Sequence, residues 1–248
     1  LVVGVHGAQG SGKTTCAHWL KRRLAAEFDL QATVLSLDDF YLPRVARESL
    51  ADAVHPLLQT RGVPGTHDVA RGTEAIRSLR HLGTGEAIEV QQFDKSIDDR
   101  SNTATCIHGP VDIVFFEGWC VGLSPQDQSA LNTPVNALEE QEDPEGQWRR
   151  YVHAQLCGPY REWFAEIDVL VMLKVPGWEQ VFEWRSQQER DTAARAPEGH
   201  ALMNAEQLRR FMDHYERLTR HALATLPEQA DVLLQLDLAH SVLVEHMR

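Results

Sequence analysis

Cysteine is scarce in this chain of 248 residues, which holds only Cys16, Cys106, Cys120 and Cys157. The four are widely separated and form no C-x-x-C pair, so the sequence favours neither a disulfide framework nor a zinc site. The twelve histidines show no metal-ligand spacing either. Scattered thiols of this kind are typical of a reducing compartment, and we expect a cytoplasmic protein.

Long apolar runs are also missing, since no stretch approaches the roughly 18 residues of a membrane-spanning helix. The opening segment LVVGVHG is too short for the apolar core of a signal peptide and leads directly into a glycine-rich motif. The chain begins without a methionine, inside an expected strand, and we expect a few residues to precede it. These features predict a protein with no membrane partner.

Positive charge is in deficit, because 24 lysines and arginines face 36 aspartates and glutamates, a formal net charge of −12. Nucleic acids recruit basic protein surfaces, so this balance argues against nucleic acid as the main partner. A net charge does not describe a single cleft, and a local basic pocket for an acidic small molecule is compatible with it. The length allows a sizeable core, in one large domain or two small ones.

Short apolar segments alternate with stretches of helical periodicity. Apolar side chains recur at helical spacing in residues 13–28 and 204–226, and Asn204 is a suitable N-cap for the second helix. Five apolar segments are expected strands: residues 1–7, 32–39, 111–119, 167–175 and 230–237. This alternation predicts an α/β fold with a parallel sheet of about five strands and helices on both faces.

Two regions interrupt the alternation. Residues 43–87 mix Pro, Gly, His and Arg around an expected helix at 71–82, and residues 122–150 are acidic and punctuated by prolines. We expect both to be insertions over one edge of the sheet. The sequence contains no internal repeat, and we predict a single domain over residues 1–248.

The segment GAQGSGKT, from Gly7 to Thr14, matches the pattern G-x-x-x-x-G-K-[ST] and lies between an expected strand and an expected helix. Its glycines let successive backbone N–H groups point at phosphates, and the helix N-terminus adds a partial positive charge. The alternative is a strand-to-helix turn that binds nothing. We predict a binding site for the phosphates of ATP, formed by Gly7, Ala8, Gln9, Gly10, Ser11, Gly12, Lys13, Thr14 and Thr15. The pattern and its context make this P-loop the strongest signal in the chain.

An acidic residue, Glu117, lies near the end of the expected strand at 111–119. A carboxylate there can hold Mg²⁺ together with the Thr14 hydroxyl, while Lys13 reaches the β- and γ-phosphates. The alternative is a carboxylate that caps a loop. No second acidic residue follows Glu117 directly, and no N-K-x-D motif follows the later strands. The sequence therefore favours a kinase over a motor ATPase or a GTPase.

Two carboxylates, Asp38 and Asp39, end the second expected strand and precede two aromatic residues. The second strand of a parallel P-loop sheet ends on the side of the phosphate-binding loop, so Asp38 is expected near the γ-phosphate. A carboxylate there can take the proton of an attacking hydroxyl, while Phe40 and Tyr41 exclude water from an acceptor site. The alternative is a pair of loop anchors. Asp39 also suits an orienting role, a water-mediated contact to Mg²⁺ or a turn cap.

Three of these segments, Gly7–Thr14, SLDDFY and FFEG, together resemble the small-molecule P-loop kinases that include uridine kinase, phosphoribulokinase and pantothenate kinase. The resemblance implies that Asp38, which is followed by one residue and then an aromatic, is the catalytic base. Four further segments are similar to D-glycerate 3-kinase: HPLLQTRGVPGTHD (55–68), FDKSIDDR (93–100), FEGWCVG (116–122) and FEWRSQQER (182–190). One difference is the spacer that follows DKS. It contains glycine in the family, and here it is only Ile97, Asp98 and Asp99.

A small carboxylate such as glycerate needs an arginine fork or a positioned lysine to bind. Cationic candidates occur in Gly- and Pro-containing segments of this otherwise acidic chain, and two carboxylates near them can accept hydrogen bonds from hydroxyls. For each of these residues the alternative is a surface ion pair. The expected acceptor site consists of Asp38, Tyr41, Arg61, His67, Asp68, Asp94, Lys95 and Arg100.

Residues 178–200 are the expected lid, a place where related kinases carry arginines that close over the phosphates. Closure would bring Arg185 and Arg190 to the transferring group and exclude water from it. Arg185 and Glu189 are spaced i, i+4, so a plain helix-surface ion pair is the alternative for Arg185.

The resemblance implies transfer of the γ-phosphoryl group of ATP, with Mg²⁺, to a hydroxyl of D-glycerate, which gives 3-phosphoglycerate. We expect a monomer or a homodimer. One alternative is a kinase for another small metabolite, such as a nucleoside or pantothenate. Another is a regulatory protein that binds ATP and turns nothing over.

Overall fold

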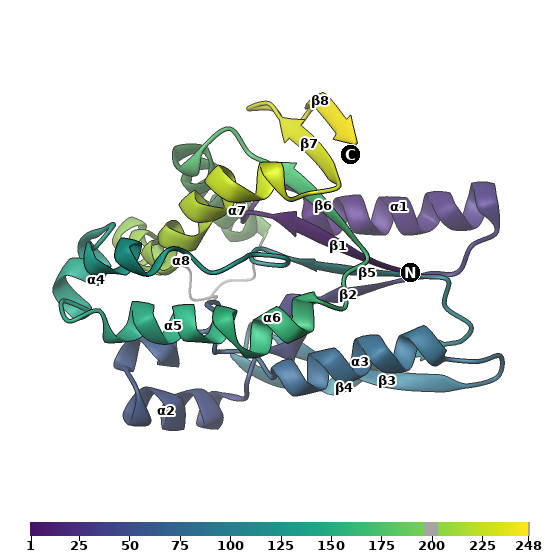
Figure 1. Ribbon diagram of the computed structural model, residues 1–248, viewed down its shortest axis with the longest axis horizontal. Coiled ribbons are helices and arrows are strands. Elements are labelled where there is room, and N and C mark those ends of the chain that lie inside the picture. Colours follow the sequence, from purple (N-terminus) through teal and green to yellow (C-terminus); the bar gives the residue numbers. More distant parts are fainter. Residues whose placement is uncertain (196–202, 248) are drawn as a thin grey trace.

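The computed structural model describes residues 1–195 and 203–247, and a twisted β-sheet runs through the middle of this part (Figure 1). Among the described residues the sheet has six strands in the order β2-β5-β1-β6-β7-β8. The first five are parallel, which confirms the predicted α/β fold, and β8 pairs antiparallel with β7. The strands are β1 Val2–Gly7, β2 Ala32–Ser36, β5 Ile113–Gly118, β6 Val169–Lys174, β7 Val232–Leu236 and β8 Val242–Met247.

The central strands are apolar because both of their faces are covered. In β5, consecutive residues Phe115 and Phe116 are both buried, and consecutive strand side chains point to opposite faces. Phe116 packs against Trp163 of α6 (Pro159–Phe164), with ring centroids 5.0 Å apart. Helix α1 (Lys13–Phe28) also contacts β5, together with β1 and β2.

The helices expected from periodicity are confirmed. Helix α1 spans Lys13–Phe28, and α8 spans Ala205–Thr225. Asn204 caps α8 with a capping box, in which its side chain accepts from Gln207 N and the Gln207 side chain accepts from Asn204 N. The other helical elements are η1 Leu37–Phe40, α2 Arg44–Ala53, η2 Pro56–Gln59, α3 Val69–His81, η3 Gln128–Asn132, α4 Ala137–Glu142, α5 Gln147–Cys157, α7 Trp178–Arg195 and η4 Leu226–Glu228.

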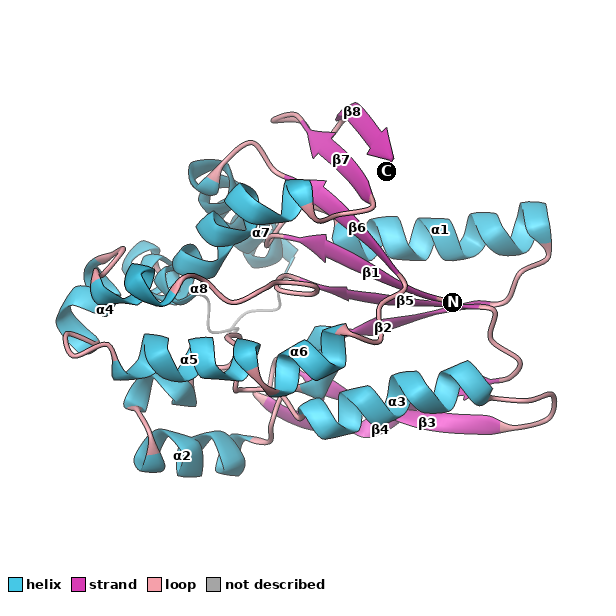
Figure 2. Ribbon diagram, viewed as in Figure 1, coloured by secondary structure: helices cyan, strands magenta, loops and turns pink. Residues whose placement is uncertain are grey.

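A β-hairpin that was not expected follows α3. Strands β3 (Ala87–Asp94) and β4 (Asp99–His108) pair antiparallel, apart from the main sheet (Figure 2). Most side chains of β4 are exposed, so its sequence carries no alternation of apolar and polar residues. The exposed strand β8 escaped prediction for the same reason.

The acidic segment 122–150 contains η3, α4 and the first residues of α5. A buried ion pair between Glu139 of α4 and Arg217 of α8 attaches it to the long helix. A second buried pair joins Asp143 to Arg149. Of the expected lid, residues 178–195 form α7, and residues 196–200 lie outside the described residues.

The carboxyl ends of the parallel strands face α7 and α8, as the arrowheads of β1, β5 and β6 indicate in Figure 1. The glycine-rich loop follows β1, the 3₁₀ helix η1 follows β2, and Glu117 lies near the end of β5. The topology therefore brings the three motifs of the sequence to one edge of the sheet.

Candidate active site

The phosphate-binding loop joins β1 to α1. Gly10 and Gly12 adopt φ angles of +78° and +83°, a region that side chains disfavour. A Cβ on Gly10 would also lie 2.9 Å from the Cβ of Trp184, so both backbone conformation and close packing require glycine there. Lys13 is the first residue of α1, at the positive end of the helix dipole.

A cavity of about 1120 Å³ opens beside this loop. It is formed by the loop, the ends of β2 and β5, the β3–β4 turn, α7 and α8. The structure thus brings together residues predicted from separate segments of the sequence. The predicted residues in its lining are Gln9, Gly10, Gly12, Lys13, Thr14, Thr15, Asp38, Tyr41, Arg61, Lys95, Glu117 and Arg185.

Thr14 and Glu117 meet at the floor of the cavity. The Thr14 hydroxyl donates to Glu117 Oε1 over 2.9 Å, and Glu117 is only 2 % exposed. Its second oxygen, Oε2, is buried without a hydrogen-bond partner among the described residues. A buried carboxylate oxygen without a partner is unfavourable, and a hard cation prefers such oxygen ligands. The residues present therefore fit Mg²⁺.

Asp38 lies in η1 with its side chain about 30 % exposed to the cavity. Tyr41 Oη donates to its Oδ1 over 2.8 Å, and Lys95 Nζ donates to its Oδ2 over 2.5 Å. Burial on its own raises the pKa of Asp38, but the charges of Lys95 and Lys13 and these two hydrogen bonds lower that pKa well below its ordinary value. Asp38 is therefore an ionised carboxylate that faces the same space as Lys13.

Asp39 lines the same cavity as Asp38, but its side chain has a different hydrogen-bond partner. Its Oδ1 accepts a hydrogen bond from the backbone N–H of Phe93 in β3, over 3.4 Å. Burial, together with the negative charges of Asp38 and Glu117, raises the pKa of Asp39. Asp39 thus ties η1 to the hairpin, which matches the loop-anchor alternative for this residue.

His67 lies behind Tyr41 and outside the cavity lining. The two rings stack with centroids 4.5 Å apart, and a hydrogen bond of 2.5 Å joins His67 Nδ1 to the hydroxyl of Tyr160. Burial lowers the pKa of His67 to about 3. His67 is therefore neutral and supports the ring of Tyr41. This position favours a supporting role for His67 over direct contact with an acceptor.

Of the remaining acceptor candidates, two line the cavity, and Asp68, Asp94 and Arg100 do not. The two that line it are Arg61 and Lys95. Arg100 and Asp68 lie outside its lining and pair with each other over 2.6 Å, the ion-pair alternative. Asp94 closes the hairpin turn, because it accepts from the backbone N–H of Ser96 over 2.8 Å and from its hydroxyl over 2.6 Å.

The two predicted lid arginines also differ in position. Arg185 lines the cavity, pairs with Glu189 over 2.6 Å and lies 5.9 Å from the ring centroid of Phe211. The expected helix-surface pair is thus present, yet it lies at the cavity wall. Arg190 is exposed, and its guanidinium donates to Gln187 Oε1 over 2.8 Å, outside the lining.

Several aromatic residues of the cavity were not predicted. Trp184 of α7 stacks on His240 with ring centroids 3.8 Å apart, and a hydrogen bond of 2.8 Å joins His240 Nε2 to the carbonyl of Gly10. Phe211 and Tyr215 belong to the apolar stripe of α8, which predicts core positions and does not reveal that they border a cavity. His240 follows the last parallel strand, and no local pattern marks it.

A parallel sheet, a glycine loop with Lys13 and an ionised aspartate across the cavity together define a P-loop kinase. No family model matches the chain. The uncharacterized kinase mug58 of Schizosaccharomyces pombe is 33% identical over 224 residues, which make up 87% of this chain and 78% of that protein. The chloroplastic D-glycerate 3-kinase of Arabidopsis thaliana is 30% identical over 235 residues, 91% of this chain and 48% of that protein. The chain spans about half the length of this plant relative.

Among solved structures, D-glycerate 3-kinase from Cryptococcus neoformans superposes with a TM-score of 0.82 at 25% identity, over 100% of this chain and 89% of the other. The chain belongs to the family of P-loop kinases that includes D-glycerate 3-kinase. It is therefore an ATP-dependent phosphotransferase with a hydroxyl group as acceptor. Within the described residues, no helix has the length and apolar character needed to cross a membrane.

Proposed function

We propose that this kinase transfers the γ-phosphoryl group of ATP to D-glycerate and forms 3-phosphoglycerate. The observation that carries the proposal is the meeting of Asp38, Lys95 and Arg61 in the cavity of the phosphate-binding loop. D-Glycerate offers hydroxyls to a carboxylate base and an anionic group to an arginine fork. The similarity to two D-glycerate 3-kinases supports the choice of acceptor.

In the proposed mechanism Asp38 orients the acceptor hydroxyl and takes its proton while the hydroxyl oxygen bonds to the γ-phosphorus. The bond from that phosphorus to the bridging oxygen breaks, and ADP leaves with both electrons of the bond. Lys13 and the loop amides hold the phosphates, and Thr14 and Glu117 hold Mg²⁺, which when bound supplies positive charge. Lys95, whose side chain is 59 % exposed, moves aside so that the hydroxyl reaches Asp38.

Arg185 is the lid arginine in this proposal, because it already lies at the cavity wall. A rotation away from Glu189 would bring its guanidinium towards the transferring group, where a positive charge stabilises the transition state. Arg190 would need a larger movement of α7 to take part. The aromatic wall of Tyr41, Trp119 and Tyr215 reduces the access of water as a competing nucleophile.

A coupled assay of ADP release with Mg-ATP tests the proposal across D-glycerate, uridine and pantothenate. We expect turnover with D-glycerate alone, and phosphorus NMR of the product should identify 3-phosphoglycerate. Turnover with another acceptor would replace the substrate and keep the kinase. ATP binding without ADP release for any acceptor would favour the regulatory alternative.

A further inference from the structure

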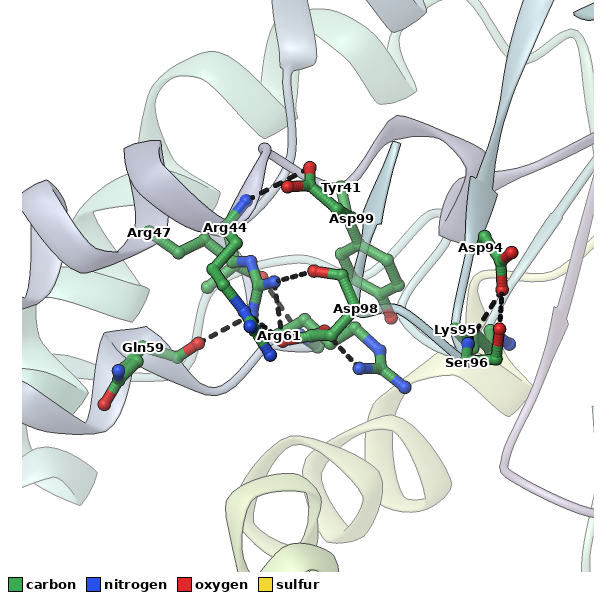
Figure 3. Close-up of polar contacts among 12 residues, drawn as sticks. Tyr41, Arg44, Arg47, Gln59, Arg61, Asp94, Lys95, Ser96, Asp98 and Asp99 are labelled. Carbon is green, nitrogen blue, oxygen red and sulfur yellow. Dashed lines mark hydrogen bonds and ion pairs between the residues drawn. The ribbon is translucent and has the colours of Figure 1, made fainter. Parts of the chain in front are cut away.

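The turn between β3 and β4 is held by an arginine from another element. Arg47 of α2 is 1 % exposed, although it carries a full positive charge. Its guanidinium donates to the carbonyls of Leu42, Gln59 and Asp98 over 3.2, 2.7 and 2.7 Å. It also pairs with the Asp98 carboxylate over 2.9 Å. Figure 3 shows Arg47 and Arg61 converging on Asp98.

Asp98 has an unusual backbone that this arrangement fixes. Its φ angle is +55°, in the left-handed region that aspartate tolerates better than most residues. Arg47 binds both its carbonyl and its carboxylate, so the conformation is held from two sides. Asp98 belongs to the short segment Ile97–Asp99, in the turn that joins β3 to the start of β4.

The Asp98 carboxylate in turn holds Arg61. Arg61 Nη1 pairs with Asp98 Oδ1, and the guanidinium lies 5.6 Å from the ring centroid of Phe93. Arg61 lines the cavity and is about 23 % exposed, whereas Arg47 lies behind the lining. Because Arg47 stays paired with Asp98, Arg61 can turn some of its donors to an anion without leaving Asp98 uncompensated.

We propose that Arg47 is a positioning residue for the acceptor: through Asp98 it sets the direction in which Arg61 presents its guanidinium to an anionic group. The inference rests on the proposed function, in which the acceptor carries a carboxylate. Neither Arg47 nor Asp98 lines the cavity, so both would influence acceptor binding only through Arg61. In the competing hypothesis, Asp98 and the acceptor compete for the guanidinium of Arg61. Removing the charge of Asp98 would then tighten acceptor binding.

The test compares Arg47→Met with Arg44→Met. Arg44 lies one turn earlier on α2 and also faces Asp98, at 3.8 Å, but its side chain is 57 % exposed. In Arg47→Met we expect the KM for D-glycerate to rise on the order of tenfold, with kcat and the KM for ATP within about twofold of the parent, because an oriented charged hydrogen bond is lost from acceptor binding alone. Arg44→Met should leave all three parameters unchanged.

A double variant separates positioning from general damage. If Arg47 acts through Arg61, the KM of Arg47→Met/Arg61→Met should equal that of Arg61→Met, whereas independent effects would multiply. Multiplying effects would overturn the inference. Asp98→Asn keeps the shape and tolerates the backbone conformation, and should also raise the KM for D-glycerate. A lower KM in Asp98→Asn would overturn it in favour of the competing hypothesis.

Hydrogen exchange of the free protein gives a readout that does not depend on the acceptor. Amides of residues 94–99 should exchange faster in Arg47→Met than in Arg44→Met, with the exchange of residues 7–15 unchanged. Unchanged exchange at 94–99 in folded Arg47→Met would overturn the inference even if D-glycerate is the substrate. If the parent does not use D-glycerate, the proposed function fails. The hydrogen-exchange comparison still decides whether Arg47 holds the turn at Asp98. If Arg47→Met does not fold, Asp98→Asn is compared with Arg44→Met by the same exchange measurement.

Discussion

At the residue scale, two positive charges and one hydroxyl converge on the carboxylate of Asp38. The charges of Lys95 and Lys13 lower the pKa of Asp38, so Asp38 in this arrangement is a weak proton acceptor. In phosphoryl transfer with a loose transition state, the main role of the base is to orient the attacking hydroxyl. A strong proton acceptor is therefore not required. In the proposed mechanism Lys95 moves aside when the acceptor binds. One of the charges that lower the pKa of Asp38 would then be removed, and that pKa would rise.

Asp38→Asn should lower kcat on the order of 10²-fold or more, because the amide cannot take the proton. ATP binding should persist, since the phosphate-binding loop is unchanged. Steady-state kinetics and calorimetric titration with ATP measure the two effects. Asp39→Asn is the matched control, and its kcat should stay within a few-fold of the parent. Equal turnover in Asp38→Asn and the parent would refute the role given to Asp38.

Glu117→Gln should raise the Mg²⁺ concentration needed for half-maximal activity by about tenfold or more. The amide can still accept the hydrogen bond from Thr14, but the negative charge that favours a divalent cation is gone. Titrating Mg²⁺ at a fixed ATP concentration measures the change. Thr14→Ser keeps the hydroxyl and serves as the control. An unchanged Mg²⁺ dependence in Glu117→Gln would mean that the carboxylate of Glu117 does not bind Mg²⁺ and has only a structural role.

At the element scale, segment 122–150 is attached to α8 by charges of two kinds. Glu139 and Arg217 form a buried pair, in which Arg217 also donates to the carbonyls of Ala130 and Thr133. Glu142 and Arg210 join the same two helices at the surface, with side chains 41 % and 52 % exposed. Burial should therefore decide which pair stabilises the attachment.

Glu139→Gln should destabilise the protein by about 3 kcal/mol, because it leaves Arg217 buried without a full countercharge. Glu142→Gln should cost at most about 1 kcal/mol, since water screens the exposed pair. Urea unfolding of both variants at one pH measures the difference. Equal losses of unfolding free energy would mean that burial of the pair is not the deciding factor.

The parallel strands and the long helices were predictable from the sequence, whereas the exposed β3–β4 hairpin and β8 were not. The short helices α5 and α6 were not predicted either, although both bury side chains. The central parallel strands are short, continuous apolar runs, and the helix of residues 205–225 buries apolar side chains at helical spacing. The β3–β4 hairpin and β8 bury too little to leave such a pattern. Lys13 and Asp38 were predictable because local motifs carry them. The role proposed for Arg47 depends on its contact with Asp98, 51 residues further along the chain, so no local spacing indicates it.

At the scale of the whole molecule, several histidines are enclosed in an acidic protein. His6, His67 and His214 are buried, and burial lowers their pKa values to about 4, 3 and 4. In an unfolded chain a histidine has a pKa of about 6.5. Below that pH the unfolded chain binds protons that these folded histidines do not, so acid favours unfolding.

The free energy of unfolding should fall as the pH is lowered from about 6.5 towards about 4, by up to about 1.4 kcal/mol per pH unit for each buried histidine. Urea unfolding at pH 7, 6 and 5 measures the slope. His214→Gln should reduce it, because one of the three groups no longer titrates. A stability that does not change between pH 7 and pH 5 would contradict the assignment.

The stack of Trp184 on His240 makes the intrinsic tryptophan fluorescence of the protein a measure of what occupies the cavity. Indole emission depends on what lies against the ring, and this ring borders the cavity next to Gly10. A nucleotide bound at the glycine loop would lie beside this stack, because His240 contacts Gly10. We expect fluorescence of the unlabelled protein to change on adding ATP. If Trp184 is the tryptophan that responds, the fluorescence change should be lost when the same titration is made with a Trp184→Phe variant.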